Sequence, residues 1–463
     1  MGIVRTIDLK TSGAPIPLYG VDDKLVRELS TALGNGRAAT AAKLIAEIHG
    51  ADQADVFERL SPSLRRCFKD ILLDQVQPEF WVNIDEGLRV ALFCDIGNHK
   101  ISALIQKLET DDAVRILGDC GARDRSEILK YVPEPTRLLF EEALRYPEDT
   151  AGRLMRREKV TVPEDWKVGD VIDFLADVDE LPEALHNLFV VNPLHSPVGY
   201  IPVHKLLGVS REEPISPLIV RDMKVLPVMT DKEEVGLFFR QYGYVSASVV
   251  DGDGVMLGVI TIDDVVTVID EEAEEDILRL AGVQGDDFYD AVVATTRARL
   301  SWLIVNLLTA ALSALVIGFF DTEIEELVAL AILMPIVTAL GGNAGTQALT
   351  VAVRAIATKE LTVNNTARTL GKEILVGGIN GLFLATILVF IVGFWFSDVG
   401  LGAVFAMAII INMVVAGFIG VAVPMALYRL GIDPAVASSV LVTATTDIVG
   451  FFCFLGLAAW LIF

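Results

Sequence analysis

The chain has 463 residues, of which 52% are hydrophobic, and its 38 Lys and Arg against 62 Asp and Glu give a formal net charge of −24. This length is too great for a single domain, and the acidic balance argues against a nucleic-acid partner, because phosphate binding needs a positive field. Only seven of the basic and nine of the acidic residues fall within 297–463. We therefore expect an acidic soluble part, suited to divalent cations, followed by a membrane part.

The sequence does not indicate an enzyme. We find no Walker-type phosphate loop and no pairing of a nucleophile with a base. The five histidines show no ligand spacing, and no CxxC or paired spacing occurs among the four cysteines, Cys67, Cys94, Cys120 and Cys453. The sequence thus predicts neither a zinc site nor a disulfide framework, and it fits a soluble part in a reducing cytoplasm.

Residues from about 20 to 145 are expected to form short amphipathic helices. Segments such as ADQADVFERLSPSLRRCF and ISALIQKLETDDAVRILGDC start at Asp, Pro or Ser, and their apolar residues recur at spacings of three and four. This periodicity is typical of a stacked helical array. We expect a helical N domain over 21–147, preceded by a disordered segment over 1–20.

From about residue 148 to 275 the pattern changes to two units, each combining a helix with short β-runs. Their sequences are LHNLFVVNPLHSPVGYIPVHKLL and VSASVVDGDGVMLGVITIDDVVTVI. In the second unit the turn DGDG separates VSASVV from VMLGVIT, which predicts a β-hairpin. A tandem α/β regulatory module is the expected result.

An acidic helix is expected directly before the membrane part. The run DDVVTVIDEEAEEDILRL places five carboxylates at helical spacings, namely Asp264, Glu271, Glu272, Glu275 and Asp276. Like charges four residues apart face alike and repel one another unless a cation bridges them. A solvated helix face is the alternative interpretation. The position of the run just ahead of the first membrane span favours a cation site.

Five apolar runs are long enough to cross a bilayer, since a spanning helix needs about 20 residues. They lie at about 300–320, 327–352, 373–396, 401–427 and 435–463. The basic residues of this part all fall on one side of the spans, and the positive-inside rule places that side, with the soluble part, in the cytoplasm. An odd number of spans then leaves the C-terminus outside. The short loop DTEIEE would face the exterior, where it either gathers cations or is merely solvated.

Asp447 is the only acidic or basic side chain between Ala435 and Phe463. Holding a carboxylate at bilayer depth costs roughly 2.5–3.5 kcal/mol on insertion scales, so such a group usually faces the protein interior or a water-filled path. A neutral, hydrogen-bonded structural Asp is the alternative. Hydroxyl residues precede Asp447 on the same helix, namely Ser438, Ser439, Thr443, Thr445 and Thr446. We favour a hydrated cation path.

The second span contains MPIVTALGGNAGTQALT, in which Pro335 and a Gly-Gly pair loosen the helix and Asn343 offers an amide oxygen. Polar groups at this depth are tolerated only against protein or water. Gly341 and Gly345, at GxxxG spacing, mark close helix packing as readily as a site. We interpret the glycines of the third and fourth spans mainly as packing positions, and Asn412 as an interhelical tie.

These segments resemble the MgtE-type magnesium channels. The match runs from about 50 to 463 and includes five signature segments in one order: YPEDTAGRLM, GVITIDDVV, EEAEEDILRLAGV, MPIVTALGGNAGTQ and the closing TATTDIVGFFCFLGLA. The resemblance implies a multidomain fold with an α-helical N domain, tandem CBS (α/β) modules and a five-helix transmembrane domain. The implied ranges are 148–213 and 214–278 for the CBS modules, 279–299 for a connecting plug helix and 300–463 for the membrane domain.

The resemblance also implies a homodimer in the bacterial cytoplasmic (inner) membrane, with the pore on the dimer axis. The family's pore carboxylate corresponds to Asp447. The further candidate pore residues are Thr443, Asp433, Ser439 and Asn343. The candidate cytosolic Mg²⁺ sensor residues are Asp264, Glu272, Glu275, Asp276, Glu233 and Asp111. The implied function is Mg²⁺-selective influx that stops when intracellular Mg²⁺ binds the cytosolic acids, with two Asp447 side chains holding a hydrated ion between them.

The chain departs from the family at several of these positions. Gly243 and Thr267 stand where further sensor acids are expected, Arg115 follows an acidic pair in the N domain, and Ser439 stands where the family has Asn. We therefore expect Mg²⁺ sensing to be weaker or shifted in this protein.

The run GVITIDD also fits the nucleotide-binding pattern of CBS modules, in which Thr261 meets a phosphate and Asp264 meets the ribose hydroxyls. The corresponding GYIPVHK of the first module lacks both groups. ATP or another adenine nucleotide is thus expected at the second module only. Asp264 would serve either the metal or the ribose.

The sequence leaves other functions open. Within transport, the alternatives are another divalent ion such as Co²⁺, Ni²⁺ or Zn²⁺, or a secondary exchanger, although spans without His or a Cys pair disfavour soft metals. A CBS-regulated anion channel is disfavoured because no Lys or Arg lies within an expected span. The third class is a membrane sensor that transports nothing, and it would be favoured if Asp447→Ala left every cellular phenotype unchanged.

Overall fold

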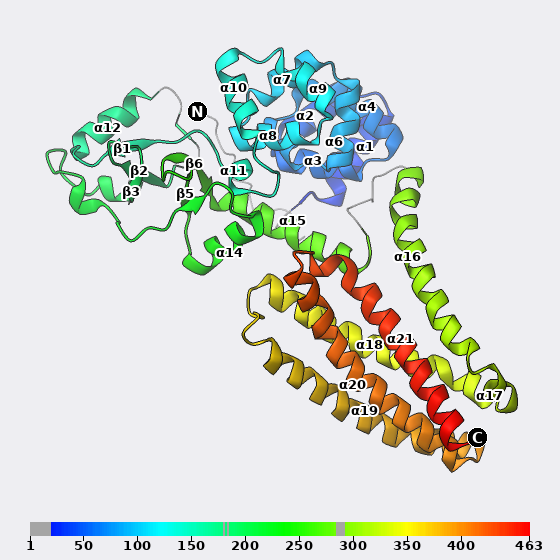
Figure 1. The fold of residues 1–463 in the computed structure, drawn as a ribbon. Coiled ribbons are helices and arrows are strands. Elements are labelled where there is room, and N and C mark those ends of the chain that lie inside the picture. Colours follow the sequence, from blue (N-terminus) through cyan, green and yellow to red (C-terminus); the bar gives the residue numbers. More distant parts are fainter. Residues whose placement is uncertain (1–19, 179–180, 183–184, 284–291) are drawn as a thin grey trace, which may run out of the picture. The chain divides into compact units, whose positions relative to one another are not determined.

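The computed structural model of the chain describes residues 20–178, 181–182, 185–283 and 292–463 (Figure 1). They form two compact units, one ending at Val268 and the other running from Ile269 to Phe463. The first unit contains helices and two small sheets, and the described residues of the second form helices and their connections. The disordered segment expected over 1–20 lies, apart from Gly20, outside the described residues.

The first unit begins with the expected helical array. Its helices are α1 (Asp23–Gly34), α2 (Ala38–Ala46), α3 (Gly50–Arg59), α4 (Pro62–Leu72), α5 (Pro78–Asn83), α6 (Glu86–Asp95), α7 (Asn98–Ile105), α8 (Thr110–Asp119), α9 (Ala122–Leu129) and α10 (Glu134–Ala143), with a 3-10 turn η1 (Leu73–Gln75). Asp22 and Asp85 cap α1 and α6 by accepting hydrogen bonds from backbone N–H groups. Phe57, Phe68 and Phe80 are buried, and their rings pack against one another. The apolar residues that recur along these helices therefore line one hydrophobic core.

Two α/β units of the same topology follow. The first sheet contains β1 (Thr161–Pro163), β2 (Asn187–Val191) and β3 (Pro197–Pro202), and the second contains β4 (Leu226–Pro227), β5 (Ser246–Val250) and β6 (Met256–Thr261). In both sheets the first strand pairs parallel with the second, which pairs antiparallel with the third. The accompanying helices are α11 (Ala151–Leu154), α12 (Val168–Asp177), α13 (Val203–Leu206), η2 (Ser216–Leu218), α14 (Lys232–Tyr242) and α15 (Ile262–Leu280). The expected tandem α/β module is confirmed.

The DGDG turn joins β5 to β6 as a β-hairpin. The Asp251 carboxylate accepts hydrogen bonds of 2.9 Å from the backbone N–H groups of Asp253 and Val255. Gly254 has a φ of 80°, a conformation that glycine adopts without a steric penalty. The hairpin prediction is confirmed, and it places Thr261 at the end of β6, directly before α15.

Among its described residues, the second unit contains five helices that are long and apolar enough to cross a membrane. They are α16 (Val292–Gly318), α18 (Ala329–Ala357), α19 (Thr366–Phe396), α20 (Val399–Arg429) and α21 (Pro434–Leu461). The five expected spans are confirmed, although α19 begins seven residues earlier than its apolar run. The connecting helix expected over 279–299 is covered only in part, because α15 ends at Leu280 and residues 284–291 lie outside the described range.

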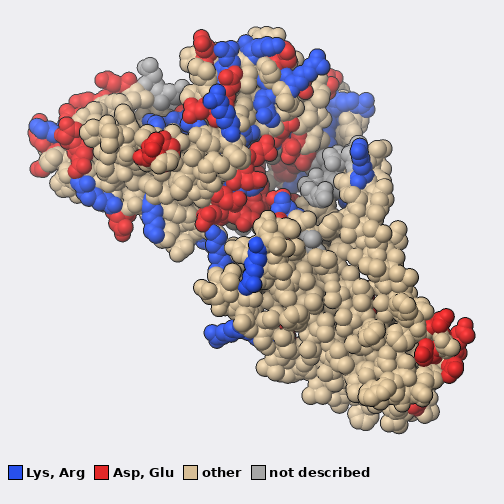
Figure 2. Space-filling view, viewed as in Figure 1, with Lys and Arg blue, Asp and Glu red and all other residues tan. Residues whose placement is uncertain are grey.

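The acidic segment DTEIEE forms a short helix, α17 (Asp321–Glu326), and the loop expected from the sequence is wrong. Asp321 and Glu323 lie in its first turn, where the helix dipole favours negative charge. Asp321 also accepts a hydrogen bond of 2.8 Å from the Thr322 N–H. Figure 2 shows acidic side chains gathered at one end of the membrane unit and Lys and Arg at its opposite end.

Glycines allow the membrane helices to approach one another closely. A Cβ atom on Gly377 of α19 would lie 2.3 Å from the Met413 carbonyl oxygen of α20. A Cβ atom on Gly345 of α18 would lie 2.6 Å from Val442 Cγ1 of α21. Small residues at helix interfaces are what such close backbone approach requires. The interpretation of these glycines as packing positions is confirmed.

Asn412 of α20 ties this core together. It is fully buried, and its Nδ2 donates a hydrogen bond of 3.0 Å to the Val337 carbonyl oxygen of α18. A Cβ atom on Gly341 would lie 2.1 Å from Asn412 Nδ2, and one on Gly450 of α21 would lie 2.8 Å from the same atom. The amide therefore fits a space that glycines leave on two neighbouring helices, as expected of an interhelical tie.

Gly377→Ala should lower the stability of the membrane unit. The added methyl group would collide with the backbone of α20, and overpacking of this kind costs about 1–3 kcal/mol. We expect the purified protein in detergent to unfold at a lower temperature than the wild type. The control is Gly371→Ala in the same helix, because nothing lies within 4 Å of its Cβ position. A Gly377→Ala protein as stable as this control would contradict the close packing of α19 on α20.

Candidate ion-binding sites

Arg156 lies among four carboxylates in the first unit. Its side chain is 7% exposed and forms ion pairs with Glu109, with Asp111 at 3.5 Å, with Asp263 at 2.7 Å and with Asp264 at 2.7 Å. We call these five residues the Arg156 cluster. Two of the acids belong to the N domain and two to the second α/β module, so the cluster joins these parts of the unit.

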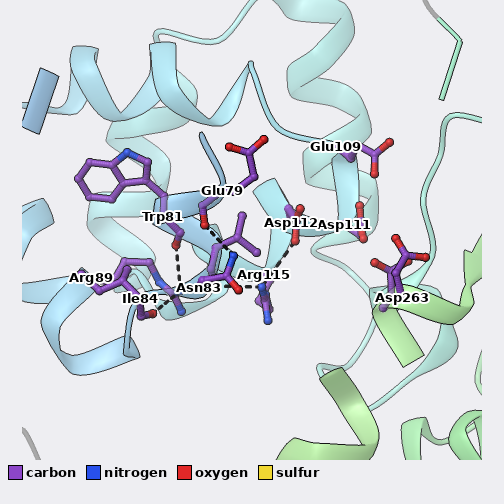
Figure 3. Close-up of polar contacts among 12 residues, drawn as sticks. Glu79, Trp81, Asn83, Ile84, Arg89, Glu109, Asp111, Asp112, Arg115 and Asp263 are labelled. Atoms are coloured by element: carbon purple, nitrogen blue, oxygen red, sulfur yellow. Dashed lines mark hydrogen bonds and ion pairs between the residues drawn. The ribbon is translucent and has the colours of Figure 1, made fainter. Parts of the chain in front are cut away.

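Each acid of the Arg156 cluster lies at the start of a helix. Glu109 is the N-cap residue of α8 and Asp111 lies in its first turn, while Asp263 and Asp264 lie in the first turn of α15. Helix dipoles favour negative charge at these positions. Arg156 follows α11, and its backbone is hydrogen-bonded to β6. In Figure 3 the carboxylates of Glu109 and Asp111 lie on the side of α8 that faces Asp263.

The carboxylates of the Arg156 cluster outnumber its single cation. Burial raises the pKa of Glu109 to about 7, although Arg156 opposes this shift. Burial also raises the pKa of Asp111 well above its usual range, and the charge of Asp264 adds to the effect. Asp111 Oδ1 is buried and has no hydrogen-bond partner in the described part of the chain. One guanidinium therefore does not offset all the negative charge collected here.

Asp264 is engaged within the protein. Its Oδ2 accepts hydrogen bonds from Thr261 Oγ1 at 2.7 Å and from Arg156 Nε at 3.0 Å, and its Oδ1 accepts one from Arg156 Nη2 at 2.7 Å. Thr261 and Arg156, with Glu158 and Asn187, line a cavity of about 20 Å³, which suffices for about one water molecule. A ribose hydroxyl or a metal ion would have to compete with Arg156 and Thr261 for Asp264.

A second group of acids lies in the second unit, around Arg279 near the end of α15. Arg279 forms ion pairs with Glu275, one turn earlier in α15, and with Asp433. Asp433 also caps α21 by accepting a backbone N–H hydrogen bond of 2.8 Å. Burial raises the pKa of Asp276, and the charges of Asp433 and Glu272 add to the shift. The structure thus brings predicted sensor acids close to a predicted pore residue, with a cation between two of them.

Asp447 lies on α21 with no hydrogen-bond or ion-pair partner among the described residues, and its side chain is half-buried. Ser439, Thr443 and Asp447 follow one another at intervals of four residues, so they lie along one face of the helix. Thr443 is exposed and Ser439 is half-buried. Ser438 and Thr446, in contrast, are fully buried and donate hydrogen bonds to carbonyl oxygens of their own helix. The hydroxyl residues of α21 therefore divide between a packed face and an uncovered one.

Asn343 occupies the face of α18 that does not pack against the neighbouring helices. Gly341 and Gly345 on either side of it are buried against α20 and α21, whereas Asn343 is exposed. The two interpretations of this segment thus concern different faces of one helix. The glycines serve packing, and the amide of Asn343 points away from that contact.

Two of the departures from the expected sensor, Gly243 and Arg115, have local structural explanations. Gly243 is the C-cap residue of α14 with a φ of 64°, a conformation that favours glycine over an acidic residue. Arg115 forms an ion pair of 3.6 Å with Asp112 and donates a hydrogen bond of 3.2 Å to a backbone carbonyl oxygen (Figure 3). Thr267 is exposed on α15, and Glu233 lies in the first turn of α14.

Arg156 is a residue of this cluster that the sequence analysis missed. It follows the YPEDTAGRLM segment directly, where a run of basic residues reads as ordinary surface charge. Its hydrogen bond to Asp264 spans 108 residues, and no local pattern indicates such a contact. Within the described ranges, no group of three or more His, Cys, Asp or Glu is arranged to hold a metal ion. In this conformation the predicted sensor acids Asp111 and Asp264 face an arginine.

Three family models match separate parts of the chain. MgtE, described as a divalent cation transporter, matches residues 334–457, which include most of α18 to α21. The MgtE intracellular N domain matches residues 48–149, and the CBS domain matches residues 215–271 in the second α/β module.

Relatives named magnesium transporter MgtE include proteins of two bacteria. The protein of Bacillus subtilis (strain 168) is 26% identical over 442 residues, which are 94% of this chain and 97% of the relative. That of Enterococcus faecalis (strain ATCC 700802 / V583) is 31% identical over 320 residues, which are 69% of this chain and 71% of the relative. A crystal structure of the cytosolic domain of the Mg²⁺ channel MgtE in complex with ATP is 23% identical, covers 52% of this chain and 99% of that chain, and has a TM-score of 0.49.

Arg279 and Asp433 should be energetically coupled. Arg279→Met and Asp433→Asn each break the ion pair, so the free energy lost in the double variant should be smaller than the sum of the losses in the two single variants. Asn at position 433 still caps the helix. We expect a coupling of about 1 kcal/mol from a double-mutant cycle, measured by denaturation of the protein in mixed micelles. The exposed pair of Arg221 and Glu164 is the control and should give a coupling near zero. Equal couplings for the two pairs would count against a structured acid group at Arg279.

Proposed function

This chain belongs to the MgtE family of magnesium transporters, and we propose that it is an Mg²⁺-selective channel that mediates influx across the bacterial cytoplasmic (inner) membrane. One observation carries the proposal. Asp447 is a half-buried carboxylate on a membrane-spanning helix, without a partner among the described residues, in line with Ser439 and Thr443. A carboxylate at this depth that has no ion-pair partner and is not fully buried requires water or a cation beside it.

The chemistry of Mg²⁺ fits this face of α21. The ion dehydrates reluctantly and is usually held by one or two carboxylates together with retained waters. Hydroxyl groups at Ser439 and Thr443 suit such a hydrated ion, because they accept hydrogen bonds from its waters without adding charge. A site of this kind binds the ion weakly enough for it to leave, as conduction requires.

We propose further that the pore lies between two copies of the chain. In a two-fold dimer the same surface of each copy meets its equivalent, so two Asp447 carboxylates would share one ion on the axis. The uncovered polar face of α21 supports this arrangement, because a lipid contact there would leave Thr443 and Asp447 in hydrocarbon. Asp433 and Asn343 are the other proposed pore residues, at the start of α21 and on the uncovered face of α18.

The proposed orientation places the soluble part in the cytoplasm and the C-terminus outside. The five spans have Lys and Arg gathered at one end of the membrane unit and the acids of α17 at the other (Figure 2). Basic residues stay preferentially on the cytoplasmic side. The acids of α17 would then face the exterior, where they raise the local concentration of cations.

We propose that intracellular Mg²⁺ closes the channel by binding cytosolic acids. The proposed residues are Asp111, Glu233, Asp264, Glu272, Glu275 and Asp276. Binding favours closure only if the closed state holds the ion better than the open state does. The group around Arg279 suits this role, since Glu275 and Asp276 lie beside Asp433 at the start of α21. A cation there would act directly on the helix that carries Asp447.

For ATP or another adenine nucleotide we propose the second CBS module, where Thr261 lines the small cavity beside Arg156. Binding would require the cavity to widen, because it has room for about one water molecule. It would also require Asp264 to exchange a hydrogen bond from Arg156 or Thr261 for one from the ribose. Nucleotide binding should therefore weaken the hydrogen bonds of the Arg156 cluster, and an intact cluster should weaken nucleotide binding.

Mg²⁺ flux should depend on Asp447. We expect purified protein in proteoliposomes to conduct Mg²⁺, and Asp447→Ala to reduce the flux at least tenfold, because the variant lacks the charge that stabilises the ion in the bilayer. The control is Glu360→Gln, which removes an exposed carboxylate from the connection between α18 and α19. Flux of Co²⁺, Ni²⁺ or Zn²⁺ in preference to Mg²⁺, or flux coupled to a counter-ion, would favour the other transporters. No Asp447-dependent flux would favour a sensor.

Raising Mg²⁺ on the cytoplasmic face should inhibit this flux. We expect Asp276→Asn to raise the inhibitory Mg²⁺ concentration several-fold, because it removes a proposed ligand beside Asp433. Glu274→Gln on the same helix is the matched control, since Glu274 is exposed. An inhibition curve that is the same in both variants would argue against sensing at this group, and flux insensitive to Mg²⁺ would argue against self-inhibition altogether.

A further inference from the structure

Arg156 occupies the position between two parts of the first unit that a bridging cation would take. Glu109 and Asp111 come from the N domain, and Asp263 and Asp264 come from the second CBS module. Without a positive charge between them, those of the four carboxylates that stay ionised would repel one another across the joint. Arg156 supplies a positive charge there that is part of the chain.

We propose that Arg156 is a built-in cation that holds the N domain against the second CBS module without any divalent ion. The closed joint is then insensitive to cytoplasmic Mg²⁺. A further consequence rests on the proposed function: among the proposed sensor residues, those around Arg279 provide most of the Mg²⁺ response, because Asp111 and Asp264 are already paired with Arg156. The mechanical claim about the joint stands apart from whether the protein conducts Mg²⁺.

The geometry of the guanidinium supports a permanent bridge. Its Nε and Nη2 atoms both donate to Asp264, at 3.0 and 2.7 Å, while Nη2 also reaches Asp263 and Nη1 reaches Glu109. Two parallel hydrogen bonds to one carboxylate are the strongest form of this pairing. All three nitrogens are thus used, and the charge cannot be lost by deprotonation, since arginine stays protonated in proteins.

A free divalent ion is at a disadvantage in this position. It would have to enter within contact distance of a guanidinium, and like charges at such distances repel strongly in a partly buried site. The Arg156 guanidinium, in contrast, is part of the chain, so its binding costs no entropy of association and does not depend on the Mg²⁺ concentration in the cell. The joint is therefore occupied whether cytoplasmic Mg²⁺ is scarce or abundant.

The exposed fractions agree with a structural bridge. Arg156 is 7% exposed and Asp111 is 8% exposed, whereas ordinary surface pairs such as Arg221 with Glu164 have both side chains more than 40% exposed. Breaking a buried pair leaves an uncompensated charge, which is far more damaging than breaking a surface pair. Removal of Arg156 should thus separate the N domain from the CBS module unless another cation binds between the carboxylates.

The test is the distance between the two parts in the full-length protein, with and without Mg²⁺. Spin labels are attached at Arg123→Cys in the N domain and Asp253→Cys in the CBS module, both exposed positions, after the native cysteines are replaced by alanine. Distance distributions are recorded by pulsed electron paramagnetic resonance in a chelator and in saturating Mg²⁺. We expect one unchanged distribution in the protein that keeps Arg156. A distribution that shifts on chelation would overturn the proposal.

Arg156→Met is the deciding variant. We expect its distance distribution in the chelator to broaden to longer distances and to return to the original on addition of Mg²⁺, because the four carboxylates then accept a divalent ion. Arg221→Met, which removes an exposed arginine, should behave as the parent protein. An Arg156→Met protein that stays closed in the chelator, or that opens and is not restored by Mg²⁺, would show that Arg156 does not stand in for an ion.

If Arg156→Met does not fold, the double variant Arg156→Met with Asp111→Asn reduces the buried negative charge and serves the same comparison. The readout is a distance and not a flux, so it separates the two claims. A protein that fails to conduct Mg²⁺ but shows the expected distances would contradict the proposed function and leave the built-in cation supported.

Discussion

A carboxylate placed within a bilayer is the constraint on which the membrane half of this molecule depends. Asp447 is the only charged side chain on its helix, and the described residues of its own chain provide it with no partner. Hydrocarbon does not solvate a charge, so the face that carries Asp447, Thr443 and Ser439 requires water, an ion or a second polar surface. The packed arrangement of α18, α20 and α21 behind that face serves to present it.

The two acid groups of the chain share one device, a cation from the protein placed between carboxylates from different elements. Arg156 links α8 to α15, and Arg279 links α15 to the start of α21. They differ in accessibility, since Arg156 is 7% exposed and Arg279 is 32% exposed. The more accessible group exchanges partners with solvent ions more readily, because water screens it and its removal from solvent costs less. A protein built in this way can keep one joint constant while the other responds to its surroundings.

Local patterns predicted much of this molecule and failed where distant residues meet. The apolar runs predicted five spanning helices, and the DGDG turn predicted the β5–β6 hairpin, because both depend on neighbouring residues. Arg156 escaped prediction since its partner Asp264 lies 108 residues away. The sequence analysis missed the α17 helix because it considered only how many acids the segment contains. It did not consider that acids in the first turn stabilise a helix. The sequence indicated Asp447 because the free-energy cost of a carboxylate in a bilayer follows from the apolar composition around it. The sequence does not determine how the helices are rotated, and this rotation decides whether Ser439 and Asn343 face the same path.

The glycine contacts determine which parts of the membrane unit are able to move. At Gly377, Gly345 and Gly420 the backbones of α18 to α21 approach so closely that added Cβ atoms would lie within 2.3 to 2.8 Å of a neighbour. Helices in such contact cannot slide or rotate past one another without separating first. The spanning window of α20 is 61% buried, and that of α16 is 6% buried. These contacts make α18 to α21 one closely packed block of four helices, whereas the same chain covers little of α16.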